Sequence, residues 1–94
     1  LQIMAVSARS RANYDDLMLG DVRFEADALS LASAPDIDVV VEVIGGADGA
    51  ARALVENALK NGKSVVTANK ALIAHHGLEL AAIAEQHGAQ LSFE

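Results

Sequence analysis

Chemically useful residues follow three apolar runs of the sequence, each at the point where the run ends. Residues 7–11 (SARSR) follow the first run, Gly45 and Gly46 follow a valine-rich run, and residues 67–70 (TANK) follow a third. A guanidinium group can hold a phosphate in a bidentate grip, and glycine lets a phosphate or a flat ring approach the backbone without interference from a Cβ. Together these residue types suit a ligand that carries phosphates and flat rings.

Arg9 and Arg11 bear on which dinucleotide would fit. In dinucleotide-binding folds, an acid after the second strand bonds the ribose 2′-OH of NAD, whereas an arginine there suits the 2′-phosphate of NADP. The first run ends without an acid and offers two arginines, which favours NADP over NAD. The alternative, from position alone, is a pair of solvated loop arginines.

The other two clusters have plain structural explanations as well. A strand-to-helix turn needs Gly45 and Gly46 for its own geometry, and Asp48 is expected to cap a helix rather than act as a catalytic acid. Lys70 would either contact a cofactor or substrate, or be solvated. Asn69 can cap the turn that follows it or bond a ligand amide.

The histidines are not expected to form a metal site. His75 and His76 are adjacent, so they face different directions on a helix, and His87 stands near a helix end. No pair has the spacing of zinc ligands and the chain has no cysteine, so we expect no bound metal. Glu42, inside the valine-rich run, has no role that the sequence explains.

The spacing of apolar residues predicts alternating strands and helices. The valine-rich run, from Val39 to Ile44, is typical of a strand buried on both faces of a parallel sheet. We therefore expect an α/β fold, with helices on both faces of a parallel sheet. The expected strands cover residues 2–8, 21–25, 39–44, 63–68 and 89–93. The expected helices cover residues 28–33 after an Asp27 cap, the segment between Asp48 and Gly62, and residues 78–87.

Composition limits the function classes that fit. The 94 residues are enough for one domain, and aromatic residues make up only 3% of them, with a net charge of −6. An acidic chain with few rings to stack on bases argues against nucleic acid as a partner. No run approaches the roughly 20 apolar residues that a membrane span requires. Without cysteine or a signal peptide, a cytoplasmic location is expected.

The run "DIDVVVEVIGG", followed by "GKSVVTANKALIAHHG" and "LAAIAEQHGAQLSFE", closely resembles the cofactor-binding domain of homoserine dehydrogenase. The resemblance covers residues 36–94 well and extends more loosely to "VSARSR" near the start. Enzymes of this family are oxidoreductases that interconvert L-homoserine and L-aspartate 4-semialdehyde with NAD or NADP, in threonine and methionine biosynthesis. The resemblance implies a Rossmann-like domain that binds one of these dinucleotides.

It also implies a cofactor site at the ends of the strands. The implied residues are, in chain order, Arg9 and Arg11 by the adenosine ribose, Ile44 and Gly45 along the dinucleotide, and Thr67, Ala68, Asn69 and Lys70 near the nicotinamide. No residue of this chain is assigned to the catalytic step.

The chain departs from the family's pattern at both ends. The family begins with a strand and a glycine-rich loop that cradles the pyrophosphate, which residues 1–94 lack, and its substrate domain would follow Glu94. We therefore expect a partial NAD(P)-binding domain that is inactive alone. In the strand order 3-2-1-4-5-6 the missing first strand is central. The strands of residues 2–8 and 39–44 would then pair directly, or a partner chain or homo-oligomer would fill the gap.

Two other functions stay open on the sequence alone. One is a non-catalytic nucleotide-sensing module of Rossmann type, and the other is an interaction or assembly domain that merely retains the fold. The flanking gene sequence would separate them from an enzyme, which needs a glycine-rich loop upstream and a catalytic domain downstream.

Overall fold

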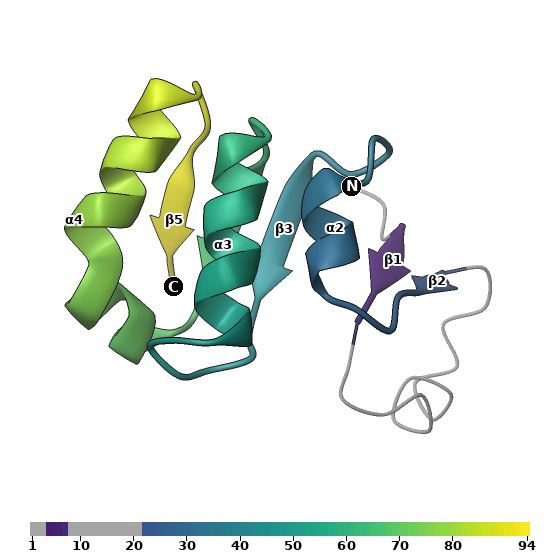
Figure 1. Ribbon diagram of the computed structural model, residues 1–94, viewed down its shortest axis with the longest axis horizontal. Coiled ribbons are helices and arrows are strands. Elements are labelled where there is room, and N and C mark those ends of the chain that lie inside the picture. The colour runs from purple at the N-terminus through teal and green to yellow at the C-terminus, as the bar shows by residue number, and fades with distance from the viewer. Residues whose placement is uncertain (1–3, 8–21) are drawn as a thin grey trace.

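A computed structural model describes residues 4–7 and 22–94 of the chain (Figure 1). Within these residues, parallel strands alternate with helices, as the apolar spacing predicts. The elements are β1 (Ala5–Val6), β2 (Arg23–Phe24), α2 (Leu29–Ser33), β3 (Val39–Glu42), α3 (Ala50–Lys60), β4 (Ser64–Thr67), α4 (Lys70–Gln86) and β5 (Leu91–Phe93). The α/β, Rossmann-like fold class is confirmed.

The larger sheet has the order β3-β4-β5, so strands that are neighbours in sequence are neighbours in space. All its pairings are parallel, with Val40 opposite Val65 and Val66 opposite Ser92. The β-branched residues of β3 and β4 favour the extended backbone that this pairing requires. Each crossover between these strands is made by one helix, α3 and then α4.

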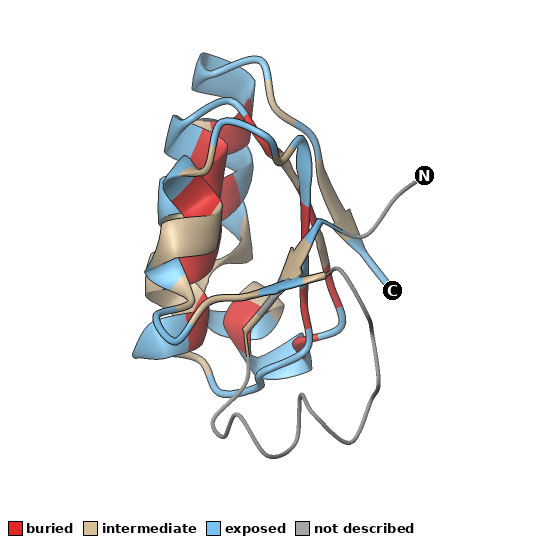
Figure 2. Cartoon of the chain, turned by 90° about the vertical axis from the view of Figure 1, so that its right-hand side faces the viewer, coloured by how far each residue is buried: buried red, intermediate tan, exposed pale blue. Residues whose placement is uncertain are grey.

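The described helices lie on one face of this sheet, so the prediction of helices on both faces is wrong for the described part of the chain. Figure 2 shows the helices on one side and the strands on the other. Parallel crossovers are almost always right-handed. Two successive crossovers that move the same way along a sheet therefore place their helices on the same face.

Residues of β3 alternate between exposed and buried because helices cover only one face of the sheet. Val40 and Glu42 face the helices and are buried, whereas Val39, Val41 and Val43 are 44%, 65% and 75% exposed. The prediction that this strand is buried on both faces is therefore wrong. The helices pack on the β3 and β4 residues of the covered face, and the core joins Val40 and Val65 to the buried sides of α3 and α4.

Helix α3 lies where it was expected, but its start is different. Its inner face buries Leu54, Val55 and Ala58, with Lys60 in the last turn. The N-cap is Gly49, with no side-chain cap, so the prediction that Asp48 caps this helix is wrong. The carboxyl of Asp48 instead contacts His76 across the gap to α4, at 3.0 Å.

Helix α4 begins at Lys70, eight residues before the expected start at residue 78. The side chain of Asn69 accepts a hydrogen bond from the backbone N–H of Leu72 at 3.0 Å, and so caps the helix. Gly77, a weak helix former, lies inside α4 and obscures its apolar pattern in the sequence. Burial of Leu72 and Leu80 against the core holds both halves together.

The two short strands at the start of the chain form a separate parallel sheet. β1 pairs with β2, with Ala5 opposite Arg23, and neither pairs with β3. The predicted direct pairing of the first strand with the valine-rich strand is therefore wrong. Each of β1 and β3 has one paired side within the described residues, and Figure 1 shows β1 between β2 and β3.

Polar side chains tie the elements together at the ends of the larger sheet's strands away from the glycine turn. Arg23 of β2 donates to both carboxyl oxygens of Asp36, at 2.8 and 3.2 Å. The hydrogen bond from Arg23 lowers the pKa of Asp36 below its ordinary value of 3.8. Lys63, buried before β4, donates to the carbonyl oxygens of Ala34 and Ile37 at 2.7 Å each. No helix in the described ranges is long and apolar enough to cross a membrane.

Candidate functional site

Two turns meet at the carboxyl ends of β3 and β4. The first, the glycine turn, is residues 43–46, and the second, the β4–α4 turn, is residues 67–70. The backbone N–H of Ala68 donates to the carbonyl oxygen of Glu42 at 3.2 Å. The Nδ2 of Asn69 donates to the carbonyl oxygen of Gly46 at 2.7 Å. The second and third of the three residue clusters that follow apolar runs therefore lie together, at one edge of the parallel sheet.

Gly45 and Gly46 present an open backbone surface. Their φ angles are 91° and 85°, a region that residues with a Cβ seldom adopt. A Cβ built on Gly45 would meet no atom of residues 4–7 and 22–94 within 4 Å. Glycine is required here by backbone conformation, and among the described residues the backbone of Gly45 is open.

This turn differs from a phosphate cradle in one respect. The backbone N–H groups of Ile44 and Gly45 donate to Oε2 of Glu42, at 2.7 and 3.1 Å. They are therefore already bonded inside the protein. A dinucleotide would meet this turn through close packing on exposed backbone and on the half-exposed side chain of Ile44, which suits a ring or ribose better than a phosphate.

Thr67 and Asn69 lie under the surface rather than on it. Thr67 is 0% exposed and Asn69 is 5% exposed. The hydroxyl of Thr67 donates to Oε1 of Glu42 at 2.6 Å and accepts from the backbone N–H of Asn69 at 3.0 Å. Of the two roles considered for Asn69, the capping role is confirmed. Both side chains support the two turns from beneath, whereas Ala68 and Lys70 of the same segment are exposed.

Lys70 is the exposed first residue of α4, beside the glycine turn. Its side chain forms no hydrogen bond or ion pair with the described residues. Its ammonium and the positive end of the α4 dipole both favour an anion at this position. Of the predicted site residues within the described ranges, Lys70 is the one with a charged side chain, and it is exposed.

Glu42 is the residue of this site that sequence reasoning missed. It is 1% exposed and stands in the helix-facing register of β3, where an apolar side chain is the rule. The available signal was the period of the strand, because the alternation that buries Val40 also buries Glu42. Assuming a strand buried on both faces hid that alternation.

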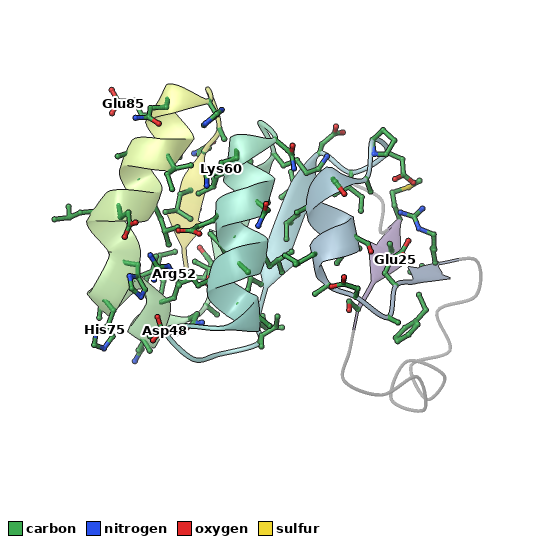
Figure 3. All side chains as sticks on the ribbon, in the orientation of Figure 1. Glu25, Asp48, Arg52, Lys60, His75 and Glu85 are labelled. Atoms are coloured by element: carbon green, nitrogen blue, oxygen red, sulfur yellow. The ribbon has the colours of Figure 1, made fainter. Side chains whose placement is uncertain are left out.

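A charged cluster lies beside the site, between the start of α3 and the first turns of α4 (Figure 3). Arg52 donates to both carboxyl oxygens of Glu79 at 3.3 Å and lies 3.7 Å from Asp48. The side chain of His76 is 17% exposed and bonds Asp48, whereas His75 is exposed. This cluster fixes the loop after the glycine turn against α4.

The predicted residues Arg9 and Arg11 lie outside the described residues. Figure 1 shows β1, which precedes them in sequence, ending at the same side of the molecule as β3. Within residues 4–7 and 22–94, the structure contains no group of three or more metal-binding side chains.

Comparison with known proteins gives one consistent family. The family model described as "Homoserine dehydrogenase, NAD binding domain" matches residues 1–94. The homoserine dehydrogenase of Pseudomonas aeruginosa is 52% identical over 75 residues, which cover 80% of this chain and 17% of that protein. The homoserine dehydrogenase of a Synechocystis species is 36% identical over 94 residues, which cover 100% of this chain and 22% of that protein.

Solved structures agree with these relatives. A homoserine dehydrogenase from Thiobacillus denitrificans superposes with a TM-score of 0.88 at 38% identity, over 97% of this chain and 21% of that one. The S. aureus homoserine dehydrogenase at pH 8.5 gives a TM-score of 0.84 at 32% identity, over 99% and 24% of the two chains. This chain thus spans about a fifth of the length of the relatives it matches.

Proposed function

Because this chain belongs to the family of homoserine dehydrogenase NAD-binding domains, we propose that it binds a nicotinamide dinucleotide across the glycine turn and the β4–α4 turn. It would serve as the cofactor-binding portion of an oxidoreductase that interconverts L-homoserine and L-aspartate 4-semialdehyde. We assign cofactor binding to this chain, and we assign no proton-transfer step to it.

One observation carries the proposal: the open backbone of Gly45 and Gly46 is braced against the β4–α4 turn at the carboxyl edge of a parallel sheet. In open α/β sheets, ligands bind beyond the carboxyl ends of the strands. The bracing bond from Asn69 to Gly46 is 2.7 Å long. It fixes the turn before any ligand arrives, so that less ordering entropy is lost on binding.

The site residues divide into those that would touch the dinucleotide and those that would position them. Ile44, Gly45, Ala68 and Lys70 are exposed and would contact it, the first two along its length and the last two near the nicotinamide. A bound nicotinamide supplies the hydride acceptor or donor. The exposed ammonium of Lys70 would hold an anionic or polar group of the cofactor, and thereby orient it.

Cofactor preference and setting extend the proposal. We propose a preference for NADP over NAD, supported by Arg9 and Arg11 after the first strand, where an NAD enzyme usually carries an acid. The absence of cysteine from these 94 residues supports a cytoplasmic protein. A homo-oligomer is supported by the one-sided cover of the larger sheet, whose open face exposes Val41 and Val43.

The test is a titration of the gene product that contains these 94 residues with NADPH and NADH, followed by reduced-nicotinamide fluorescence. We expect both to bind, NADPH more tightly, and the same protein to oxidise L-homoserine when NADP⁺ is supplied as the hydride acceptor. Absence of binding for both would overturn the cofactor role. Replacing Arg9 with Ala should remove most of the difference between NADPH and NADH, and tighter binding of NADH to the unaltered protein would sink the role of Arg9.

A further inference from the structure

Glu42 is an acidic side chain in a position built for an apolar one. It is the last residue of β3 and is 1% exposed, in the same helix-facing row as Val40. Burying a carboxyl group costs several kcal/mol unless hydrogen bonds replace its water. A valine strand that carries such a group therefore requires the structure to supply partners for it.

Three donors from two different segments meet the carboxyl of Glu42. Oε2 accepts from the backbone N–H groups of Ile44 and Gly45, at 2.7 and 3.1 Å. Oε1 accepts from the Thr67 hydroxyl at 2.6 Å. One oxygen thus serves the glycine turn and the other serves the β4–α4 turn. A neutral glutamine would offer only one acceptor oxygen to the two turns.

The bonds close into a ring that joins both turns. The Thr67 hydroxyl accepts from the N–H of Asn69 at 3.0 Å, and the side chain of Asn69 returns to the carbonyl oxygen of Gly46 at 2.7 Å. Starting from Glu42, the ring therefore passes through Thr67 and Asn69 and comes back along the glycine turn. The side chain of Asn69 also accepts a hydrogen bond from the backbone N–H of Leu72 and so caps α4.

We propose that Glu42 is a positioning residue for dinucleotide binding. Its carboxyl holds the backbone of Gly45 in the conformation that the cofactor packs against, without touching the cofactor. Two consecutive glycines with positive φ have more freedom to lose than any other pair, so the turn needs an internal clamp to be ordered in advance. This inference rests on the proposed function and names the residue that makes its surface.

The experiment compares three variants of the gene product with the unaltered protein: Glu42→Gln, Glu42→Leu and Thr67→Val. A donor left without its acceptor no longer holds the backbone of its turn in place. The dissociation constant for the dinucleotide should therefore rise about tenfold in Glu42→Leu, if the turn must be reordered on binding. Glu42→Gln retains one acceptor oxygen and should recover much of this loss. Thr67→Val should weaken binding in the same direction as Glu42→Leu.

Three readouts separate positioning from general stability. Binding is measured well below the melting temperature of each variant, where all molecules are folded. The amide protons of Ile44 and Gly45 should exchange faster with solvent in Glu42→Leu and Glu42→Gln. The KM for the dinucleotide should rise while kcat changes little, because the carboxyl does not touch the reacting atoms. Glu85→Gln, an exposed carboxyl at the far end of α4 (Figure 3), is the matched control and should bind as the unaltered protein does.

The outcomes distinguish this inference from the proposed function. If the unaltered protein binds the dinucleotide and Glu42→Leu and Thr67→Val bind it equally well, Glu42 is not a positioning residue and the proposed function stands. If all variants melt at lower temperature with unchanged dissociation constants, Glu42 is structural only, and the inference is overturned. If the unaltered protein binds no dinucleotide, the proposed function fails and this inference fails with it.

Discussion

At the scale of single residues, the candidate site contains exposed residues that a ligand could reach and buried residues that support them. Lys70 and Ala68 are exposed, whereas Thr67 and Asn69, their neighbours in sequence, are buried and bonded inside the protein. Residues that share one short motif therefore differ in whether a ligand could reach them. A motif read along the chain shows which residue types are present, and only the fold shows which of them face the ligand.

Replacing Lys70 with Ala should weaken dinucleotide binding about tenfold, since a charge-assisted hydrogen bond is lost. Stability should hardly change, because Lys70 is exposed and alanine favours the start of a helix. Fluorescence titration and urea unfolding measure the two effects.

The matched control for Lys70 is Lys60→Ala, an exposed lysine at the other end of α3 (Figure 3). This control should bind the dinucleotide normally. Equal binding by Lys70→Ala and Lys60→Ala would show that Lys70 is a solvated surface residue.

The residue types at the site could be predicted from the sequence, but the support for them could not. Gly45 and Lys70 stand at strand ends, where chain order alone indicates a ligand site. Glu42 bonds Thr67, which lies 25 residues further along the chain. No local pattern predicts such a pair, because it depends on the register between β3 and β4.

At the scale of the elements, α4 shows where local patterns fail. The sequence predicts its second half from Leu80 and Ala84, which are buried. Its first half has adjacent histidines and Gly77, which weaken the pattern, and its start depends on the cap from Asn69. Tertiary burial of Leu72 decides the outcome over local preference.

Lys63 links three elements, and its loss should destabilise the fold. Its ammonium donates to carbonyl oxygens in the connection between α2 and β3. Replacing it with Met preserves the apolar stem and removes a charged donor from both carbonyl groups, of which Ala34 keeps the 3.3 Å bond from the N–H of Ile37. The free energy of unfolding should fall by about 2 kcal/mol, measured by urea denaturation. Lys60→Met, on the exposed end of α3, should change it little; equal effects would show that the Lys63 bonds add nothing.

The ion pair between Arg23 and Asp36 should make stability depend on pH. The hydrogen bond from Arg23 lowers the pKa of Asp36 in the folded state. A carboxyl with a lowered folded pKa stabilises the fold above its unfolded pKa, and that contribution is lost as the pH falls through the folded value. Stability should therefore decline as the pH drops below the ordinary value of 3.8.

The variant Asp36→Asn tests this dependence. It removes the titrating group, so the urea midpoint should fall less steeply with acidification than in the unaltered protein. Because the pair is on the surface, salt should reduce the difference. Parallel pH profiles for the two proteins would rule out a contribution from this pair.

At the scale of the whole molecule, the described residues form two sheets and a single helical layer. One face of the larger sheet is covered by α3 and α4, while the other exposes Val39, Val41 and Val43. Strand edges and exposed apolar rows of this kind favour pairing with other chains. This follows from topology, since both crossovers lie on the same side.

We expect the 94-residue chain to associate as its concentration rises, and Val41→Lys to reduce that association. The side chain of Val41 is 65% exposed, so a lysine there adds charge to the open face without entering the core. Sedimentation velocity measures the association, and an unchanged urea midpoint shows that the variant is folded. A strictly monomeric chain at high concentration would contradict the expectation.

The sequential order β3-β4-β5 also bears on how the molecule is assembled. Every strand of that sheet pairs with the next strand along the chain, so residues 39–93 make contacts between near neighbours. Loops that are closed over short separations cost little entropy and form early. The β1–β2 sheet joins this unit through the Arg23–Asp36 pair. Folding is thus expected to begin in the carboxyl-terminal half, so that the glycine turn and the β4–α4 turn form before β1 and β2 are in place.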